Sequence, residues 1–514
     1  MIFDAGAEAT ASAPPAASIP PLVQAPLADA AITMEFTLDP ADLPALSRFP
    51  AIRRAGPSRP QRFIWYDDAE RSIAGQNLSL LRDGATWQLD RLAPDARHEW
   101  PAAAPPPPVA RADDAGSLVA LDPVPEVPFD DIPFDIAPAS AFDGRHRRYD
   151  IGSVAISVLH GTVRGVVETR PACRVTLTGS PADLAALLPA LSPLALSVPR
   201  ASLACEANAA AAGTPLPERH LGAPALDGAI PVGEGLVTVI GHLLDALLFW
   251  TDSFRRERRP EAIHQARVAT RRLRSALSLY RPAACPELGA AAAALKHCAE
   301  TLGAARDWDV FLGGTGPALV AIKPGDPRIA GLLRAASRQR EVGYTGVNDY
   351  LASAAFRHLT IDLAAAAVLT PWQRVQDPDP LLQTATAPFA ADVLTRRLKR
   401  VRRRARGLAT LPIDALHELR KDCKRLRYAA EFFAPAFPAK HTKPFLRRLS
   451  ILQEELGTLN DSATAGLLLA RLGRSGRGYA GGLVDGMAAA AAVPARARIE
   501  ANWRRFKRVD PFWK

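Results

Sequence analysis

Residues Glu261 to Tyr280 read EAIHQARVATRRLRSALSLY, and a matching stretch, Leu416 to Phe433, reads LHELRKDCKRLRYAAEFF. Both stretches place one histidine and three cations at positions i, i+3, i+7 and i+10, and the second set follows the first by 153 residues. At about 100° per residue, each set lies within about 80° of the helix circumference, opposite an apolar arc. The sequence therefore predicts two amphipathic helices, each with one basic face. We call the eight residues of these faces the ladder: His264, Arg267, Arg271, Arg274, His417, Arg420, Lys424 and Arg427.

The similarity between the two stretches continues beyond the ladder. Leu302-Gly303 followed by Asp307 recurs as Leu456-Gly457 followed by Asp461. Aligned cations without interleaved acids repel one another, and a solvated basic surface is the simplest interpretation of one such helix. The repetition in the same register instead favours a duplicated helical unit whose basic faces bind a shared polyanionic ligand.

A third basic segment, 396–406, comes directly before the second ladder helix. Its cations Arg396, Lys399, Arg400 and Arg403 share one helix face, so an antiparallel hairpin would bring them beside the ladder. A solvated surface helix is the alternative. With the neighbouring cations of the ladder helices, the predicted polyanion-binding residues are His264, Arg267, Arg271, Arg272, Arg274, Arg396, Lys399, Arg400, Arg403, His417, Arg420, Lys421, Lys424, Arg425 and Arg427.

Charge is distributed unequally along the 514 residues, whose net charge is +10. Residues 231–514 hold 45 Lys/Arg and 26 Asp/Glu, whereas residues 1–230 hold 18 and 27. The basic excess is thus confined to the half that contains the ladder. Arginine predominates there, and its forked guanidinium suits phosphate oxygens.

The five cysteines, at 173, 205, 285, 298 and 423, are odd in number and lack metal or redox spacing, which predicts free thiols in a reducing compartment. No cationic start followed by an apolar run marks a signal peptide. The most apolar run, Leu236 to Trp250, contains His242 and Asp245 and is too short to span a bilayer, so we expect a buried helix. The protein is expected in the cytoplasm, without a membrane partner.

The first half of the chain is β-rich. Residues 1–30 are rich in Ala and Pro and predict a disordered tail, and 31–210 an α+β domain of short strands with helices at Pro40–Ser47 and Pro181–Leu188. Pro-rich loops are expected at Pro101–Pro108 and Pro123–Pro138, and a Gly/Pro linker at 211–230. From 231 to 514 the pattern is helical almost throughout.

The ladder residues carry a family resemblance. The His-x-x-Arg helix leading into Arg271-Arg272-Leu273-Arg274, the second copy ending Lys424-Arg425-Leu426-Arg427-Tyr428, and the Leu-Gly segments resemble the CHAD domain, the conserved histidine α-helical domain. The resemblance covers about 230–514. It implies an all-α fold of two pseudo-symmetric four-helix bundles with a basic groove that binds inorganic polyphosphate. Association of the protein with polyphosphate granules is left open.

The domain before it resembles, in layout, the CYTH or triphosphate tunnel domain, an antiparallel barrel that holds metal through carboxylates and triphosphate through cations. The family's Glu-x-Glu-x-Lys strand corresponds to Thr33–Thr37, which keeps only Glu35, and its Arg-x-Arg strand falls near Leu81-Arg82-Asp83. Its later acidic strand falls on Cys173–Thr178, and its closing Ser-Lys-x-Glu-Arg on Ser202–Glu206. Because these metal-binding acids are largely missing, we expect a degenerate domain without catalysis or cofactor. An unrelated β-rich domain is the alternative.

Three functions compete. Non-catalytic polyphosphate binding is favoured; a metal-dependent triphosphatase or polyphosphatase in the barrel is the first alternative, and nucleic-acid binding the second. The basic faces lack interleaved aromatic residues for base stacking, which disfavours nucleic acid. A metal site of His264 or His417 with Asp307, Asp309 and Asp461 is disfavoured by the cationic neighbours; we expect these Asp residues to cap helices or orient ladder arginines.

Overall fold

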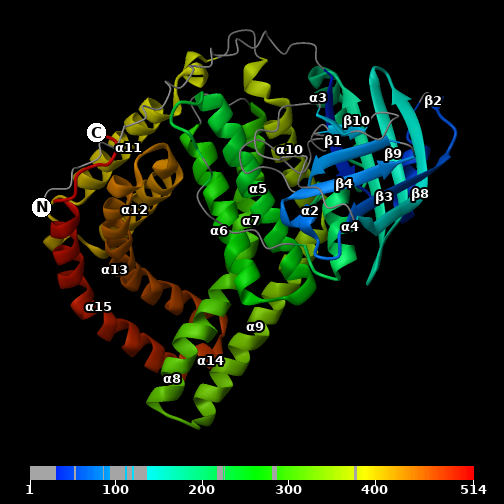
Figure 1. The fold of residues 1–514 in the computed structure, drawn as a ribbon. Helices are drawn as coiled ribbons and strands as arrows, with labels where there is room; N and C mark the ends of the chain where they lie inside the picture. Colours follow the sequence, from blue (N-terminus) through cyan, green and yellow to red (C-terminus); the bar gives the residue numbers. More distant parts are fainter. Residues whose placement is uncertain are drawn as a thin grey trace, which may run out of the picture. The chain divides into compact units, whose positions relative to one another are not determined.

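The computed structural model describes residues 31–50, 52, 54–84, 86–92, 110–112, 118–120, 136–216, 224, 226–280, 286–374 and 379–514. They form an antiparallel sheet with short helices, followed by a long all-helical region (Figure 1). The predicted tail, 1–30, lies outside the described residues, and so do most of the predicted loop segments and residues 217–223 and 225 of the predicted linker.

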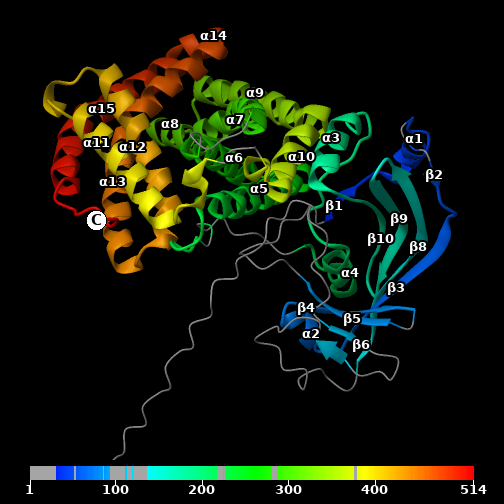
Figure 2. The ribbon, with the colours of Figure 1, turned by 90° about the horizontal axis from the view of Figure 1, so that it is seen from above.

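The sheet is open. Its strands are β1 (Ile32–Thr37), β2 (Arg54–Ala55), β3 (Arg59–Asp67), β4 (Leu78–Asp83), β5 (Thr86–Arg91), β6 (Ala110–Ala112), β7 (Leu118–Ala120), β8 (Ala137–Ile151), β9 (Val154–Gly165) and β10 (Thr169–Gly179). Their order is β1-β10-β9-β8-β3-β4-β5-β6-β7, with β2 paired to β8, and the described strands end at the edges β1 and β7. The sheet curves into a half-barrel (Figure 2), which is consistent with the CYTH-like layout.

Two glycines opposite each other let the central strands approach closely. Gly144 of β8 pairs with Gly161 of β9. A Cβ on Gly144 would lie 2.3 Å from the carbonyl oxygen of His160, and one on Gly161 would lie 2.2 Å from that of Asp143. The alternation of the sequence predicts two separate strands here, Ser153–Leu159 and Thr162–Glu168; that was wrong, because Gly161 continues β9 instead of turning the chain.

Strand β8, 15 residues long, was not predicted. It carries Arg145, Arg147 and Arg148, and these charges hide the alternation of buried and exposed positions. Pro138 lies within the strand opposite Tyr66, where the register with β3 shifts, so a proline assigned to a loop is accommodated at an irregularity.

Four helices accompany the sheet: α1 (Leu43–Ser47), α2 (Ser72–Gly75), α3 (Pro181–Ala190) and α4 (Leu203–Ala212). Ser180 caps α3 by accepting a hydrogen bond from the Asp183 amide, as its Ser-Pro start predicts. Ser202 caps α4 in the same way, so the residues matched to the family's closing motif form the start of a helix. Ala207 and Ala210 of α4 pack against Phe142 and Val163.

The helical region contains a duplication. Its helices are α5 (Val232–Glu257), α6 (Pro260–Leu279), α7 (Pro286–Val310), α8 (Gly316–Ile322), α9 (Pro327–Ala352), α10 (Ala354–Leu369), α11 (Thr386–Arg404), α12 (Ile413–Phe433), α13 (Ala439–Arg471), α14 (Arg474–Arg477) and α15 (Tyr479–Phe506). The starts of α11, α12 and α13 follow those of α5, α6 and α7 by 154, 153 and 153 residues. In each copy the second helix packs between the first and the third.

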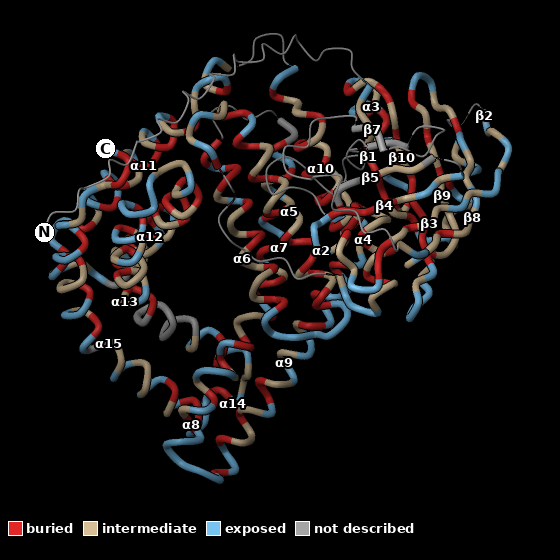
Figure 3. Tube along the Cα trace, viewed as in Figure 1, coloured by how far each residue is buried: buried red, intermediate tan, exposed pale blue. Residues whose placement is uncertain are grey.

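Helix α5 contains the expected apolar run, Leu236–Trp250, and extends beyond it at both ends. By length and composition alone it could cross a membrane, since an 18-residue window has a mean hydropathy of 1.6. Of that window 67% is buried, and α5 packs against α6 and α10 (Figure 3). The expectation that the run is too short to span was therefore wrong, whereas the expected buried helix is observed.

Several predicted boundaries fall inside helices. The sequence pattern places helix ends at residues 304 and 457, and both are wrong, because α7 continues to Val310 and α13 to Arg471. The pairs Gly313-Gly314 and Gly481-Gly482, predicted as turns, lie in a π-helical segment and in α15. At Gly481 a side chain would lie 1.8 Å from the Gly476 carbonyl oxygen, so that glycine permits close packing and not a turn.

Candidate polyanion-binding site

The first ladder helix, α6, begins with Pro260 at its first position and Glu261 in its first turn. Both favour a helix start, because proline has no amide hydrogen to satisfy and a carboxylate complements the helix dipole. Ala266, Ala269 and Leu273 are fully or almost fully buried. This burial fixes the rotation of α6, so the ladder residues lie on its half-buried or exposed side.

Arg267 is held by the third helix of its copy. Its Nη1 donates a hydrogen bond of 3.1 Å to the Ala299 carbonyl oxygen of α7. A Cβ at Gly303 would lie 2.2 Å from the same nitrogen, so the absent side chain makes room for the guanidinium. Burial lowers the pKa of Arg267, while the nearby charge of Asp307 raises it. The Leu-Gly part of this segment thus makes room for a ladder arginine, and Asp307 lies near enough to act on its charge.

A cavity of about 410 Å³ lies beside this helix, and we call it the α6–α7 cavity. Its cations are Arg267, Arg271 and Arg274 from α6 and Arg471 from the end of α13; Glu300 and Asp307 of α7 also line it. Among the described residues, no carboxylate forms an ion pair with the three α6 arginines. The buried Nε of Arg271 has no hydrogen-bond partner there. Sequence reasoning missed Arg471, which is distant in the chain from both ladder helices.

The second ladder helix, α12, repeats the arrangement with more acid. A Cβ at Gly457 of α13 would lie 3.7 Å from Nη2 of Arg420, which matches Gly303 and Arg267 in the first copy. Arg427 donates a hydrogen bond to the Ser450 hydroxyl of α13 at 3.2 Å and forms an ion pair with Glu431 at 3.2 Å. His417, Arg420 and Lys424 are partly buried on the same face.

The two halves of the ladder meet at Tyr428 of α12. The guanidinium of Arg271 lies 5.1 Å from the centre of its ring, and that of Arg427 lies 5.7 Å from it. Arg272 of α6 also reaches Glu431 of α12, at 3.5 Å. Two cations from the two copies are thus brought to one aromatic ring. The sequence identified Tyr428 only as part of the family motif and did not predict it as a site residue.

The basic segment 396–406 covers the second half of α11 and the two residues that follow it, and α11 packs against α12 as the predicted hairpin requires. A cavity of about 880 Å³, the α11–α12 cavity, is lined by Ser278, Arg396, Arg397, Lys399, Arg400, Arg402, Arg403, Arg406, Asp422 and Arg425. Five predicted residues are therefore brought together here: Arg396, Lys399, Arg400, Arg403 and Arg425. Arg397, Arg402 and Arg406 were missed because the wheel placed them off the chosen stripe.

The other predicted residues lie elsewhere. Arg272 lines a small cavity of about 20 Å³ with Tyr428 and Glu431. Lys421 pairs with Glu418 at 2.7 Å on the exposed surface. His264 is half-buried, and burial followed by the charge of Arg306 lowers its pKa below the ordinary value.

Within the described part of the chain, no group of three or more His, Cys, Asp or Glu side chains is placed to hold a metal ion. Asp309 accepts a hydrogen bond of 2.8 Å from the Tyr344 hydroxyl instead of facing a histidine. The side chain of Asp461 lies outside the described residues. Of the cysteines, 173, 205, 298 and 423 are buried free thiols, and Cys285 is not described.

In the half-barrel, the two remaining family-type acids converge on one arginine. Arg174 Nε lies 3.2 Å from Glu35 Oε1, and Arg174 Nη2 lies 2.8 Å from Glu206 Oε2. The Arg174 side chain is 4% exposed and donates a further hydrogen bond of 3.1 Å to the Ala201 carbonyl oxygen. Burial disfavours its charged form, but the two carboxylates hold the pKa of Arg174 above its ordinary value. A permanent cation therefore occupies the space between these acids.

Comparison with known proteins agrees with the helical geometry. Residues 238–470 match the family model of the CHAD domain. Among solved structures, the chain is similar to the CHAD domain from the plant Ricinus communis, with 29% identity and a TM-score of 0.48 over 55% of this chain and 94% of that one. It is also similar to PptA from Streptomyces chartreusis, with 17% identity and a TM-score of 0.42 over 53% and 99%. No curated protein matches the chain.

Proposed function

Because residues 238–470 form a CHAD domain, we propose that this protein binds inorganic polyphosphate through its ladder surface, without catalysis. The observation that carries the proposal is the convergence of Arg271 and Arg427, one from each copy, on Tyr428. Where two basic helices meet in this way, a phosphate polymer can contact cations from both copies at once.

Helix α6 connects the two large cavities. It contributes Arg267, Arg271 and Arg274 to the α6–α7 cavity and Ser278, one turn further, to the α11–α12 cavity. Cations dominate both linings. A linear polyanion that follows this helix would contact arginines of three helices while releasing its counterions, which favours long chains over orthophosphate.

We also propose that the half-barrel does not act as a metal-dependent triphosphatase. Glu35 and Glu206, the acids that a metal would need, are engaged by Arg174. Helix α4 packs by apolar contacts with Phe142 and Val163 on the same sheet face. These features support a degenerate domain without a catalytic role.

The test is a titration of the full-length protein with long-chain polyphosphate at low and high salt, with and without Mg²⁺. By analogy with single-stranded nucleic acid, engaging about four cations gives a slope of log K against log salt near −3, which is roughly 60-fold between about 50 and 200 mM salt. Mg²⁺ should weaken binding, because it competes for the phosphates. Binding that is absent, insensitive to salt or dependent on Mg²⁺ would overturn the proposal.

The alternatives predict different results in the same preparation. Mg²⁺- or Mn²⁺-dependent release of phosphate from tripolyphosphate, lost on Glu35→Gln, would favour an enzyme. RNA that displaces polyphosphate at equal phosphate concentration would favour a nucleic-acid binder. Polyphosphate binding with neither result is the outcome we expect.

A further inference from the structure

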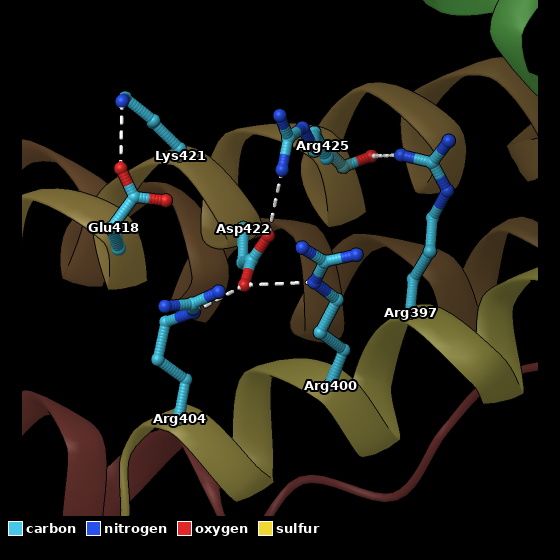
Figure 4. A network of polar contacts seen from close by, with 7 residues as sticks. All are labelled: Arg397, Arg400, Arg404, Glu418, Lys421, Asp422 and Arg425. Carbon is cyan, nitrogen blue, oxygen red and sulfur yellow. Dashed lines mark hydrogen bonds and ion pairs between the residues drawn. The ribbon is translucent and has the colours of Figure 1, made fainter. Parts of the chain in front are cut away.

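One carboxylate, Asp422, holds two arginines of the α11–α12 cavity, Arg400 and Arg425, together with Arg404 of α11. The Asp422 side chain is 2% exposed, and its Oδ2 accepts hydrogen bonds from Nε of Arg404 at 2.7 Å and Nε of Arg400 at 3.2 Å. Its Oδ1 accepts one from Nη1 of Arg425 at 3.0 Å. Figure 4 shows the three guanidinium groups gathered from α11 and α12 around this buried acid.

The contacts leave much of each guanidinium available. Arg400 and Arg404 are held through Nε, so their terminal nitrogens form no part of the ion pair. Arg400 and Arg425 are 51% and 53% exposed above an acid that is almost fully buried. Asp422 therefore fixes the positions of the arginines from beneath while their outer edges face the solvent.

The surroundings of this cluster are strongly cationic. Eight cations and one carboxylate, Asp422, are among the side chains that line the cavity. Arg397 is also held in place, because its Nη1 donates a hydrogen bond of 2.9 Å to the Arg425 carbonyl oxygen. Burial, followed by the charges of Arg425 and Arg400, lowers the pKa of Arg397 to about 10. A bound anion would relieve this repulsion.

We propose that the α11–α12 cavity is a separate subsite for the dianionic terminal phosphate of a phosphate chain, whether a short oligophosphate or the end of a long polymer, and that Asp422 is its positioning residue. This inference rests on the proposed function. A terminal phosphate carries a charge of about −1.5 to −2 near pH 7 and three acceptor oxygens, whereas an internal phosphate carries one charge. Guanidinium groups fixed in a cluster match such a compact group, and the extended ladder matches the chain.

The decisive comparison is Asp422→Asn with Asp392→Asn. Both variants add one positive charge at this part of the protein, and Asp392 is an exposed residue of α11 that pairs with Arg396. If the cavity attracts anions only by net charge, both variants bind tripolyphosphate more tightly. If Asp422 positions the arginines, Asp422→Asn weakens tripolyphosphate binding about tenfold, the order of one charge-assisted hydrogen bond, while Asp392→Asn does not.

A second pair of variants tests the same subsite without a substitution at a buried position. Arg425 and Arg272 occupy equivalent positions of the two copies, but Arg425 lines the cavity and Arg272 pairs with Glu431. Arg425→Gln should weaken tripolyphosphate binding about tenfold, and Arg272→Gln less than threefold. Circular dichroism and thermal unfolding report whether each variant is folded.

Cyclic trimetaphosphate, which has three phosphates and no chain end, separates a terminal-phosphate site from a general anion site. The wild-type protein should prefer tripolyphosphate to trimetaphosphate, and Asp422→Asn and Arg425→Gln should reduce that preference. A general loss of packing would weaken the binding of both ligands and leave the preference unchanged. Comparing tripolyphosphate with long-chain polyphosphate separates free oligophosphates from polymer ends. Equal binding of the cyclic and linear trimers, or tripolyphosphate binding unchanged in both variants, overturns the subsite. Loss of long-chain binding in wild type would instead overturn the proposed function.

Discussion

The two ladder helices share a framework, but at one buried position an apolar side chain of the first corresponds to an acid of the second. Ala269 of α6 corresponds, 153 residues later, to Asp422 of α12. Ala269 is fully buried, and α6 packs beside the apolar helix α5. Asp422 is as well buried, but it faces the basic helix α11 and accepts from three arginines.

This difference shows that the duplicated framework and the charge cluster depend on different residues. Both copies keep the ladder and a glycine that faces its second residue, Gly303 for Arg267 and Gly457 for Arg420. Only the second copy adds a buried acid together with a basic partner helix. The shared features belong to the common surface, and the added acid belongs to the α11–α12 cavity.

The largest effect is expected from removing cations of both copies at the point where they meet. The variant Arg271→Ala, Arg274→Ala, Lys424→Ala and Arg427→Ala should reduce affinity for long-chain polyphosphate more than a hundredfold and flatten the salt slope by about 3. Isothermal titration at two salt concentrations measures both quantities. The bundle should remain folded, because the four side chains lie outside its apolar core.

A matched control removes four cations elsewhere. Arg334, Arg338, Lys440 and Lys443 are exposed residues of α9 and α13. Their replacement by alanine lowers the net charge equally and should change affinity only a few-fold. If both quadruple variants bind equally well, the ladder is not the binding surface.

The ladder was predictable because it depends on local periodicity. A helix of 3.6 residues per turn places i, i+3, i+7 and i+10 on one face whatever the rest of the fold does. The repeat then related two distant helices without any contact information. The CHAD fold followed from the same residues, and the match over 238–470 confirms it.

The contacts between helices were not predictable in this way. The meeting of Arg271 with Tyr428 and the position of Arg471 depend on tertiary packing across more than 150 residues. One signal was available for Asp422: it is an acid at a core position where the first copy has Ala269. Since a buried carboxylate needs partners, this substitution points to the cations of the preceding basic helix.

The next effect compares the two glycines. Replacing a helical glycine by alanine usually stabilises a helix by about 1 kcal/mol. Gly457→Ala should show this gain, since the new Cβ would lie at an ordinary contact distance of 3.7 Å from Arg420. Gly303→Ala should show little or no stabilisation, because it displaces Arg267 from its hydrogen bond to Ala299. The loss of that hydrogen bond costs about 1 kcal/mol and offsets the gain in helix stability.

Chemical unfolding measures both changes, and polyphosphate titration adds a second difference. Gly303→Ala should weaken binding several-fold because Arg267 leaves its place in the α6–α7 cavity, whereas Gly457→Ala should leave binding nearly unchanged. Equal stabilisation by both substitutions would show that Arg267 has room to move, and that the two glycines do not differ in role.

The smallest effect concerns proton uptake at His264. Burial and the charge of Arg306 lower the pKa of this histidine, so it is neutral near pH 7 in the free protein. A bound polyanion offsets the surrounding positive charge and raises that pKa, so binding takes up a proton and tightens as the pH falls below the free-state value. Between about pH 7.5 and 5.5 we expect affinity for long chains, whose internal phosphates stay ionised, to rise two- to fivefold.

His264→Gln should abolish this pH dependence of affinity. His441→Gln, at an exposed position of α13 outside the ladder, should retain it. Affinity that rises with pH in wild type, or the same pH profile in His264→Gln, would mean that this histidine does not face the bound phosphates.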